Sequence, residues 1–296
     1  MTAVPGSDRL PAGLGTARSA QAKPGARPNW LLYVLLFIGI LLVVGPFVWM
    51  LLGSFKPQGD FLRNPPTFLP SEPTLDNYQR LVDRLDFPRF FFNSTLVATV
   101  VTAGNLIFCP MLGYALAKLR WRGKGIVLAV VLATLMVPAG VTLVPNFVLM
   151  SSLNLVNTYP GLILPFLAGP FGVFLMRQFM LSVPDELLEA ARIDGASEWR
   201  TFWTVVMPLA TPVLATLGIL TFLGSWNGFL YPLIMATESE MYTLPVALAT
   251  FATGQFQADH GMLMAGSVIL VVPVLIVFIL FQRWITEGIA TTGLKG

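Results

Sequence analysis

Six separate runs of apolar residues constrain this chain more than any other feature of its sequence. The first run, residues 30–52, is continuous and contains no charged side chain. A helix of about 17 to 25 apolar residues is long enough to cross the hydrocarbon core of a bilayer. Apolar residues make up 55% of the 296 residues, and the mean hydropathy is +0.73. The sequence therefore predicts an all-α membrane protein with six transmembrane helices.

The runs and the polar stretches between them predict the layout of the chain. We expect spans at residues 30–52, 91–117, 125–144, 160–176, 209–230 and 262–281. We interpret the rest as a disordered basic tail (1–29), a polar extracytoplasmic loop (53–90), a core of five spans (91–284) and a C-terminal tail (285–296).

The basic residues predict the orientation of these spans. The tail at 1–29 and the loop at 118–124 carry four basic residues each. The loop at 53–90 carries five, but five acidic residues balance them. Because excess Lys and Arg mark cytoplasmic loops, we expect both termini to be cytoplasmic.

A polar segment, residues 182–208, lies between the fourth and fifth spans and faces the cytoplasm in this orientation. Its charged residues are Asp185, Glu186, Glu189, Arg192, Asp194, Glu198 and Arg200. Ser182 is a candidate N-cap with Asp185 in the capping-box position, and Gly195 fits a left-handed turn that ends the helix. Ser197 is placed to cap a second helix. The pattern predicts a short, rigid helix whose small alanines allow another surface to approach.

The same residues resemble the EAA loop of ABC importer permeases. Glu189, Ala190 and Ala191 are followed after three residues by Gly195, and after nine more by a Val-Val-Met-Pro ending at Pro208, where the family has Ile-x-Leu-Pro. The resemblance implies a type I ABC importer permease fold, in which this loop docks in a cleft of a separate ATP-binding subunit. It assigns that contact to Glu189, Ala190, Ala191, Asp194, Gly195 and Pro208.

Further residues resemble the carbohydrate importers within that family, close to the shorter maltose-type permease subunit. They are Asn93-Ser94, Trp226-Asn227, Phe281-Gln282-Arg283 and the terminal Gly-Leu-Lys-Gly. This resemblance implies a bacterial inner-membrane complex with a second permease subunit, two copies of an ATP-binding subunit and an extracytoplasmic sugar-binding protein. It also implies a C-terminal contact through Gly293, Leu294, Lys295 and Gly296, for which a frayed chain end is the alternative.

The spans as placed contain no Asp, Glu, Lys, Arg or His, which argues against an ion-coupled carrier. We find no phosphate-binding loop and no catalytic or metal-binding constellation, and the charge pattern does not suggest nucleic acid. We therefore expect a transport subunit rather than an enzyme, with ATP and Mg bound by partner subunits and no cofactor on this chain.

Uncharged polar residues in or near the spans are candidates for the solute pathway: Asn93, Ser94, Thr95, Thr102, Asn105, Thr221, Ser225, Asn227 and Tyr231. Of the residues in these spans, we select Asn93, Asn105, Trp226 and Asn227, since amides and aromatic rings bind sugars. The alternative is that they bond neighbouring helices. The predicted function is a pore-forming subunit of an ATP-driven sugar or oligosaccharide importer. An importer of glycerol phosphate or a polyol, and an ion-coupled carrier, remain as alternatives.

Overall fold

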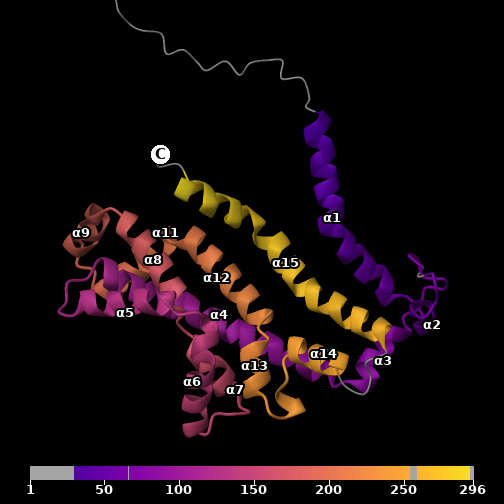
Figure 1. The fold of residues 1–296 in the computed structure, drawn as a ribbon. Helices are drawn as coiled ribbons and strands as arrows, with labels where there is room; N and C mark the ends of the chain where they lie inside the picture. Colours follow the sequence, from indigo (N-terminus) through magenta and orange to yellow (C-terminus); the bar gives the residue numbers. More distant parts are fainter. Residues whose placement is uncertain (1–29, 66, 254–258, 294–296) are drawn as a thin grey trace, which may run out of the picture. The chain divides into compact units, whose positions relative to one another are not determined.

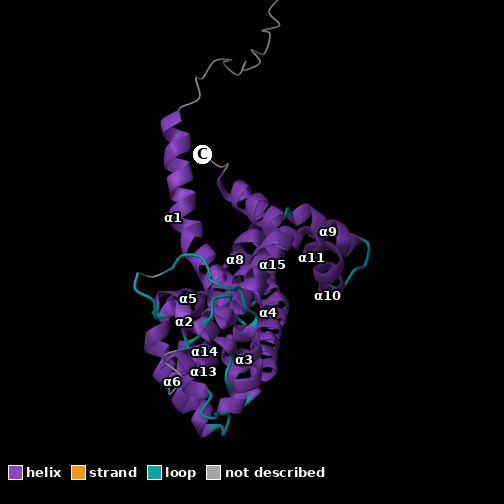
Figure 2. Ribbon diagram, turned by 90° about the vertical axis from the view of Figure 1, so that its right-hand side faces the viewer, coloured by secondary structure: helices purple, strands orange, loops and turns teal. Residues whose placement is uncertain are grey.

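A computed structural model describes residues 30–65, 67–253 and 259–293, and every regular element in these ranges is a helix (Figures 1 and 2). The predicted N-terminal tail and residues 294–296 lie outside the described residues. The chain divides into two compact units, residues 1–47 and 48–296. The described part of the first unit is a single apolar helix, the main length of α1 (Trp30–Ser54).

The second unit contains the last turns of α1 and all of the other helices. Up to the middle of the chain these are α2 (Gln58–Phe61), α3 (Asp76–Arg84), α4 (Phe87–Ala117), α5 (Lys124–Met136), α6 (Ala139–Ser152), α7 (Tyr159–Ile163), η1 (Leu164–Phe166) and α8 (Pro170–Ser182). The remainder are α9 (Asp185–Ile193), α10 (Glu198–Thr201), η2 (Phe202–Val206), α11 (Met207–Leu209), α12 (Thr211–Trp226), α13 (Leu230–Met235), η3 (Ser239–Met241), α14 (Leu244–Thr253) and α15 (His260–Gly293).

Helix α4 is the centre of the second unit, where it packs against α8 and α12. Its residue Gly113 allows a close approach, because a Cβ there would lie 2.8 Å from the backbone nitrogen of Arg177 in α8. Cys109, on the same side of α4, is fully buried, as its place in an apolar span predicts. Helix α12 packs against α15 as well as against α4, so it lies between these two helices.

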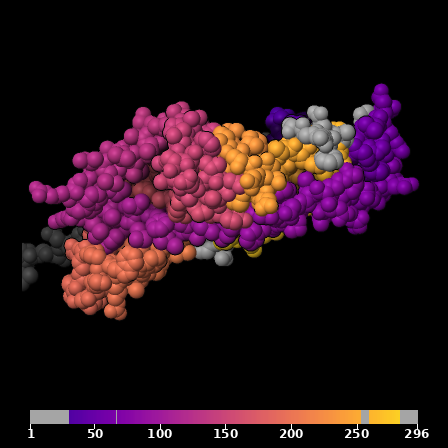
Figure 3. Space-filling model, turned by 90° about the horizontal axis from the view of Figure 1, so that it is seen from below, coloured from indigo at the N-terminus to yellow at the C-terminus, as the bar shows by residue number. Residues whose placement is uncertain are grey.

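Two polar contacts define the opposite ends of this bundle. Lys118, just beyond α4, pairs with Asp185 at the start of α9, with Nζ and Oδ1 2.6 Å apart. Arg80 of α3 pairs with Asp259 at the start of α15, with Nη1 and Oδ2 2.6 Å apart. We call these the α9 end and the α3 end. Figure 3 shows magenta residues of the middle of the chain toward one end and violet residues of the first loop toward the other.

Four described helices are long and apolar enough to cross a membrane: Trp30–Ser54, Phe87–Ala117, Tyr159–Ser182 and His260–Gln282. Two bent pairs raise the number to six if each pair is one span: α5 with α6, bent by 110°, and Glu198–Leu209 with α12, bent by 79°. The all-α prediction is therefore confirmed for the described residues, which contain four to six candidate spans.

The third span was predicted at about 125–144, and the structure breaks the helix inside this range. Val137 has extended backbone (φ −84°, ψ 120°) and ends α5, and α6 leaves at 110° and continues to Ser152, through part of the predicted loop. Pro138 explains the break, since a proline disfavours helical geometry in the residue before it. The fourth span also differs, because α8 continues six residues past the predicted end at 176 and includes Arg177.

Candidate functional site

Helix α9 forms the exposed centre of the 182–208 segment, but it begins differently from the prediction. Pro184, with extended backbone, precedes the helix, and no side chain caps the N-terminal turn. The hydroxyl of Ser182 instead donates to the carbonyl of Phe179 within α8, at 2.7 Å. Asp185 still lies in the first turn, where a carboxylate is favoured by the helix dipole.

The turn after α9 has the predicted geometry. Gly195 has φ +77°, the left-handed conformation that glycine adopts without strain. The amide of Ala196 donates to the carbonyl of Ala191 at 2.9 Å, and the amide of Gly195 donates to that of Arg192 at 3.0 Å. These two bonds form a Schellman motif, which satisfies the last carbonyls of the helix. Ser197 then caps α10 by accepting from the amide of Arg200, as predicted.

The surface that α9 presents combines small residues with two large apolar ones. Glu189, Ala190, Asp194 and Gly195 are exposed, Ala191 is half-buried, and Pro208 is exposed in α11. Ile193 is 86% exposed and Trp199 of α10 is 59% exposed. The sequence analysis did not select these two, although an isoleucine and a tryptophan beside a polar turn are a recognisable signal. Large apolar side chains in this position suit a protein partner.

The other side of α9 is fixed to the bundle. Leu188 is buried with residues of α4, α8 and η2. Lys118 donates to the carboxylate of Asp185 and to the carbonyl of Val183, each at 2.6 Å. The bond from Lys118 lowers the pKa of Asp185 below its usual range, so this carboxylate stays ionised at neutral pH. The exposed surface of α9 is thus held on a rigid base.

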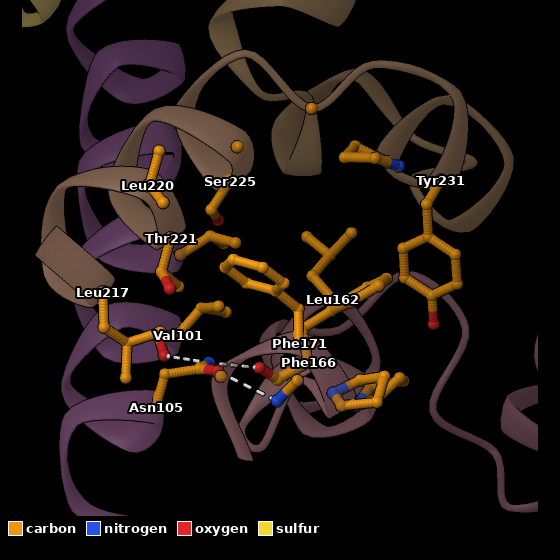
Figure 4. Close-up of a pocket in the computed structure, with 18 of the residues that line it drawn as sticks. Val101, Asn105, Leu162, Phe166, Phe171, Leu217, Leu220, Thr221, Ser225 and Tyr231 are labelled. Carbon is orange, nitrogen blue, oxygen red and sulfur yellow. Dashed lines mark hydrogen bonds between the residues drawn. The ribbon is translucent and has the colours of Figure 1, made fainter. Parts of the chain in front are cut away.

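A second site is a cavity of about 360 Å³ between α4, α7, η1, α8, α12 and α13 (Figure 4). It is lined mostly by apolar and aromatic side chains, among them Phe166 and Phe171, with hydroxyl groups from Thr221 and Ser225. Tyr231 also lines it, but its hydroxyl donates to the carbonyl of Gly161 at 2.8 Å. Thr221 and Ser225 are four residues apart on α12 and so lie on one face of that helix. Aromatic rings beside hydroxyl groups can stack on and hydrogen-bond to a polar solute.

Of the four residues selected for the solute pathway, Asn105 lines this cavity. Its amide nitrogen donates to the carbonyls of Val101 and Phe166, at 2.9 and 2.7 Å, and its oxygen accepts from the amide of Gly169 at 2.9 Å. Asn105 therefore holds the break between η1 and α8 against α4, and its contact with a solute stays a prediction.

The other three selected residues lie outside the lining of the cavity. Asn93 is fully buried, and its amide nitrogen donates to the carbonyls of Glu240 and Tyr242, both at 2.9 Å. Trp226 is buried, and its indole nitrogen donates to a carbonyl of α15 at 3.0 Å. Asn227 follows the last residue of α12, is exposed, and donates to the carbonyl of Leu223 in that helix. The first two join helices, and a role in the pathway is untested for all three.

A bundle of apolar helices that holds a rigid, exposed helix between two of its spans has the architecture of a membrane permease subunit. Residues 110–291 match the family described as "binding-protein-dependent transport system inner membrane component". This range covers more than half of the chain, and the chain belongs to that family.

Individual relatives agree with this assignment. The arabinooligosaccharides transport system permease protein of Halalkalibacterium halodurans is 39% identical, covering 90% of this chain and 97% of the relative. The sn-glycerol-3-phosphate transport system permease protein of Yersinia pestis is 30% identical, covering 87% and 94%. A solved bacterial ABC transporter involved in the import of the acidic polysaccharide alginate superposes with a TM-score of 0.76 at 27% identity, covering 86% of this chain and 95% of that chain. The chain is thus a transport subunit rather than an enzyme.

Proposed function

We propose that this chain is a pore-forming permease subunit of an ATP-driven importer for a sugar or oligosaccharide in the bacterial inner membrane. The observation that carries the proposal is α9, an EAA-type helix that ends in a Schellman turn and exposes Glu189 and Ala190 while its other side is fixed to the bundle. This arrangement suits the transmission of force from a partner that binds the exposed face.

In this proposal the energy comes from two ATP-binding subunits, which hold ATP and Mg. They bind α9 and the chain that follows it through Glu189, Ala190, Ala191, Asp194, Gly195 and Pro208, and residues 293–296 make a second contact. A second permease subunit completes the pore, and an extracytoplasmic binding protein delivers the solute. Both termini and α9 then lie on the cytoplasmic side. A packed helix moves as a body, so closure of the ATP-binding subunits shifts the spans between outward-open and inward-open states.

Two observations support a sugar as the solute. The names of the arabinooligosaccharide permease and the alginate transporter point to carbohydrates. The cavity of Figure 4 presents aromatic rings and hydroxyl groups, which suit the faces and hydroxyls of sugar rings. Glycerol phosphate is the second candidate, because one relative is named for its transport.

The test is solute-stimulated ATP hydrolysis. The permease is purified with its co-expressed partners, reconstituted into liposomes and supplied with its binding protein and a panel of oligosaccharides, polyols and glycerol phosphate. We expect one oligosaccharide class to stimulate hydrolysis and accumulate inside. Stimulation by glycerol phosphate alone would select the second candidate, and uptake that needs an ion gradient and no ATP would contradict both.

The role of α9 is tested separately with Ala190→Trp, which places a bulky side chain on its exposed face. We expect this variant to insert in the membrane but to bind the ATP-binding subunits weakly. Ala129→Trp on the exposed face of α5 is the matched control and should bind them normally. Equal binding by the two variants would refute docking at α9.

A further inference from the structure

The 182–208 segment is joined to the spans in three ways: by the chain that enters it from α8, by the chain that leaves it toward α12, and by side-chain contacts with α4. The contacts with α4 are the most rigid of the three. We propose that Glu198 and Tyr114 are positioning residues that hold α9 to the C-terminal end of α4, so that motion of α9 passes into α4. This inference rests on the proposed docking of the ATP-binding subunits at α9.

Glu198 connects two elements through its two carboxylate oxygens. Its Oε1 accepts from Nε of Arg192 in α9 at 2.8 Å, and Nη2 of the same arginine lies 2.8 Å away. Its Oε2 accepts from the hydroxyl of Tyr114 in α4, also at 2.8 Å. Tyr114 is 4% exposed, and its ring centroid lies 5.4 Å from that of Phe202. Hydrogen bonds to an ionised group are stronger than neutral ones. The bond from the buried Tyr114 is the better shielded part of this link, because the side chains of Arg192 and Glu198 are 45% and 46% exposed.

A second contact holds the other end of α9 to the same helix face. Lys118 follows Tyr114 by four residues, so both side chains leave α4 in the same direction. Lys118 binds Asp185 at the start of α9, whereas Tyr114 reaches Arg192 in the last turn of α9 through Glu198 of α10. Leu188 is buried between these two attachments. Helix α9 and the end of α4 are therefore held together at both ends and in the middle.

The covalent connections on either side of α9 are irregular by comparison. Val183 and Pro184 are both extended and separate α9 from α8. On the other side the π-helical stretch η2 follows α10, and the chain then bends by 79° before α12. A π-helical stretch and a sharp bend interrupt the regular hydrogen-bond pattern that makes a helix stiff. Force applied to α9 therefore meets a more rigid connection in α4 than in α8 or α12.

Helix α4 also reaches the cavity. Val97, Val101 and Asn105 of α4 line it, and Asn105 is bonded to Phe166 and Gly169 in the adjoining wall. A displacement of α4 would thus move two walls of the cavity. The physical path runs from α9 through Glu198 and Tyr114 to α4.

The first experiment measures solute transported per ATP in the reconstituted transporter, alongside binding of the ATP-binding subunits. Tyr114→Phe removes one hydroxyl and leaves the ring. We expect binding to be unchanged and transport per ATP to fall by about tenfold, the scale on which one hydrogen bond to a charged group changes an equilibrium. Glu198→Gln should give a similar loss, and the double variant should be no worse than the poorer single variant, because both break one link. Tyr78→Phe, which removes a comparable tyrosine hydrogen bond in the first loop, is the control and should keep the wild-type ratio.

A second measurement does not depend on transport. Spin labels at Glu186 of α9 and at Leu112 of α4, both exposed, report the distance between the two helices. In the wild-type protein we expect one narrow distribution of distances between the two labels, which ATP binding leaves unchanged. In Tyr114→Phe we expect a broad distribution of these distances. A distance that changes with ATP in the wild-type protein, or a wild-type transport ratio in Tyr114→Phe, would overturn the inference. Normal binding of the ATP-binding subunits to Ala190→Trp would instead refute the proposed function, so the two failures are distinct.

Discussion

Replacing Gly195 with valine tests whether the turn after α9 is as rigid as its geometry indicates. Gly195 has φ +77°, and a Cβ built there has no atom within 4 Å. The substitution therefore adds backbone strain but no clash. A residue with a Cβ pays about 1–2 kcal/mol in the left-handed region, and a β-branched residue lies toward the upper end.

This strain is released when the turn opens. Lowering the free energy of opening by about 1–2 kcal/mol multiplies the fraction of molecules with an open turn by roughly 5 to 30. The amides at positions 195 and 196 are protected by bonds to Arg192 and Ala191. We expect hydrogen exchange at these two amides, measured by mass spectrometry on the permease in lipid nanodiscs, to accelerate by that factor. Exchange in the helices of the bundle should not change.

Two further variants define the outcome. Gly125→Val is the matched control, because its site is also open but needs no positive φ, and it should leave exchange at the turn unchanged. Gly195→Asn should show a smaller effect than valine, since asparagine tolerates the left-handed conformation. Exchange at 195 and 196 within about twofold of wild type in the valine variant would refute the reasoning, because a strain of even 1 kcal/mol predicts more.

Three other predictions follow from single contacts. Lys118 lowers the pKa of Asp185 from its ordinary value of 3.8, so the ion pair stabilises α9 above pH 3.8 and this stabilisation is lost as the pH falls through the lowered pKa. A spin label on α9 should therefore keep constant mobility from about pH 8 to 5 and become mobile only below about pH 4. Gly113→Val should lower the melting temperature in detergent by several degrees or abolish folding, because its Cβ would meet the α8 backbone at 2.8 Å, whereas Gly125→Val should not. Trp226→Phe keeps a buried ring but leaves a carbonyl of α15 without its donor, and should lower the free energy of unfolding by about 1–3 kcal/mol; an unchanged unfolding curve would contradict that role.

The 182–208 segment was predictable because its geometry is local. A glycine after a short helix and a serine before the next helix determine the turn within a few residues of themselves, and both lie where the sequence predicted. The start of α9 was predicted wrongly because Ser182 and Pro184 both fit the start of a helix. In the structure Pro184 rather than Ser182 precedes the helix.

Features that depend on distant contacts were not predictable in the same way. Asn93 was selected for the solute pathway because it is an amide in a span, but its partners are carbonyls about 150 residues away. The bend at Pro138 lies inside an unbroken apolar run. Hydropathy depends on composition alone, so it does not show that the helix axis changes direction there. The cavity lining combines residues of six elements, of which the sequence identified the polar members without their aromatic neighbours.

The most direct test of the account is photo-crosslinking in intact cells from position 190, the exposed alanine of α9. A photoreactive amino acid there should capture an ATP-binding subunit, and the same residue at position 129 should not. Capture of an extracytoplasmic protein, or no capture of a nucleotide-binding chain in cells that transport the solute, would contradict the claim that this transporter is driven through α9.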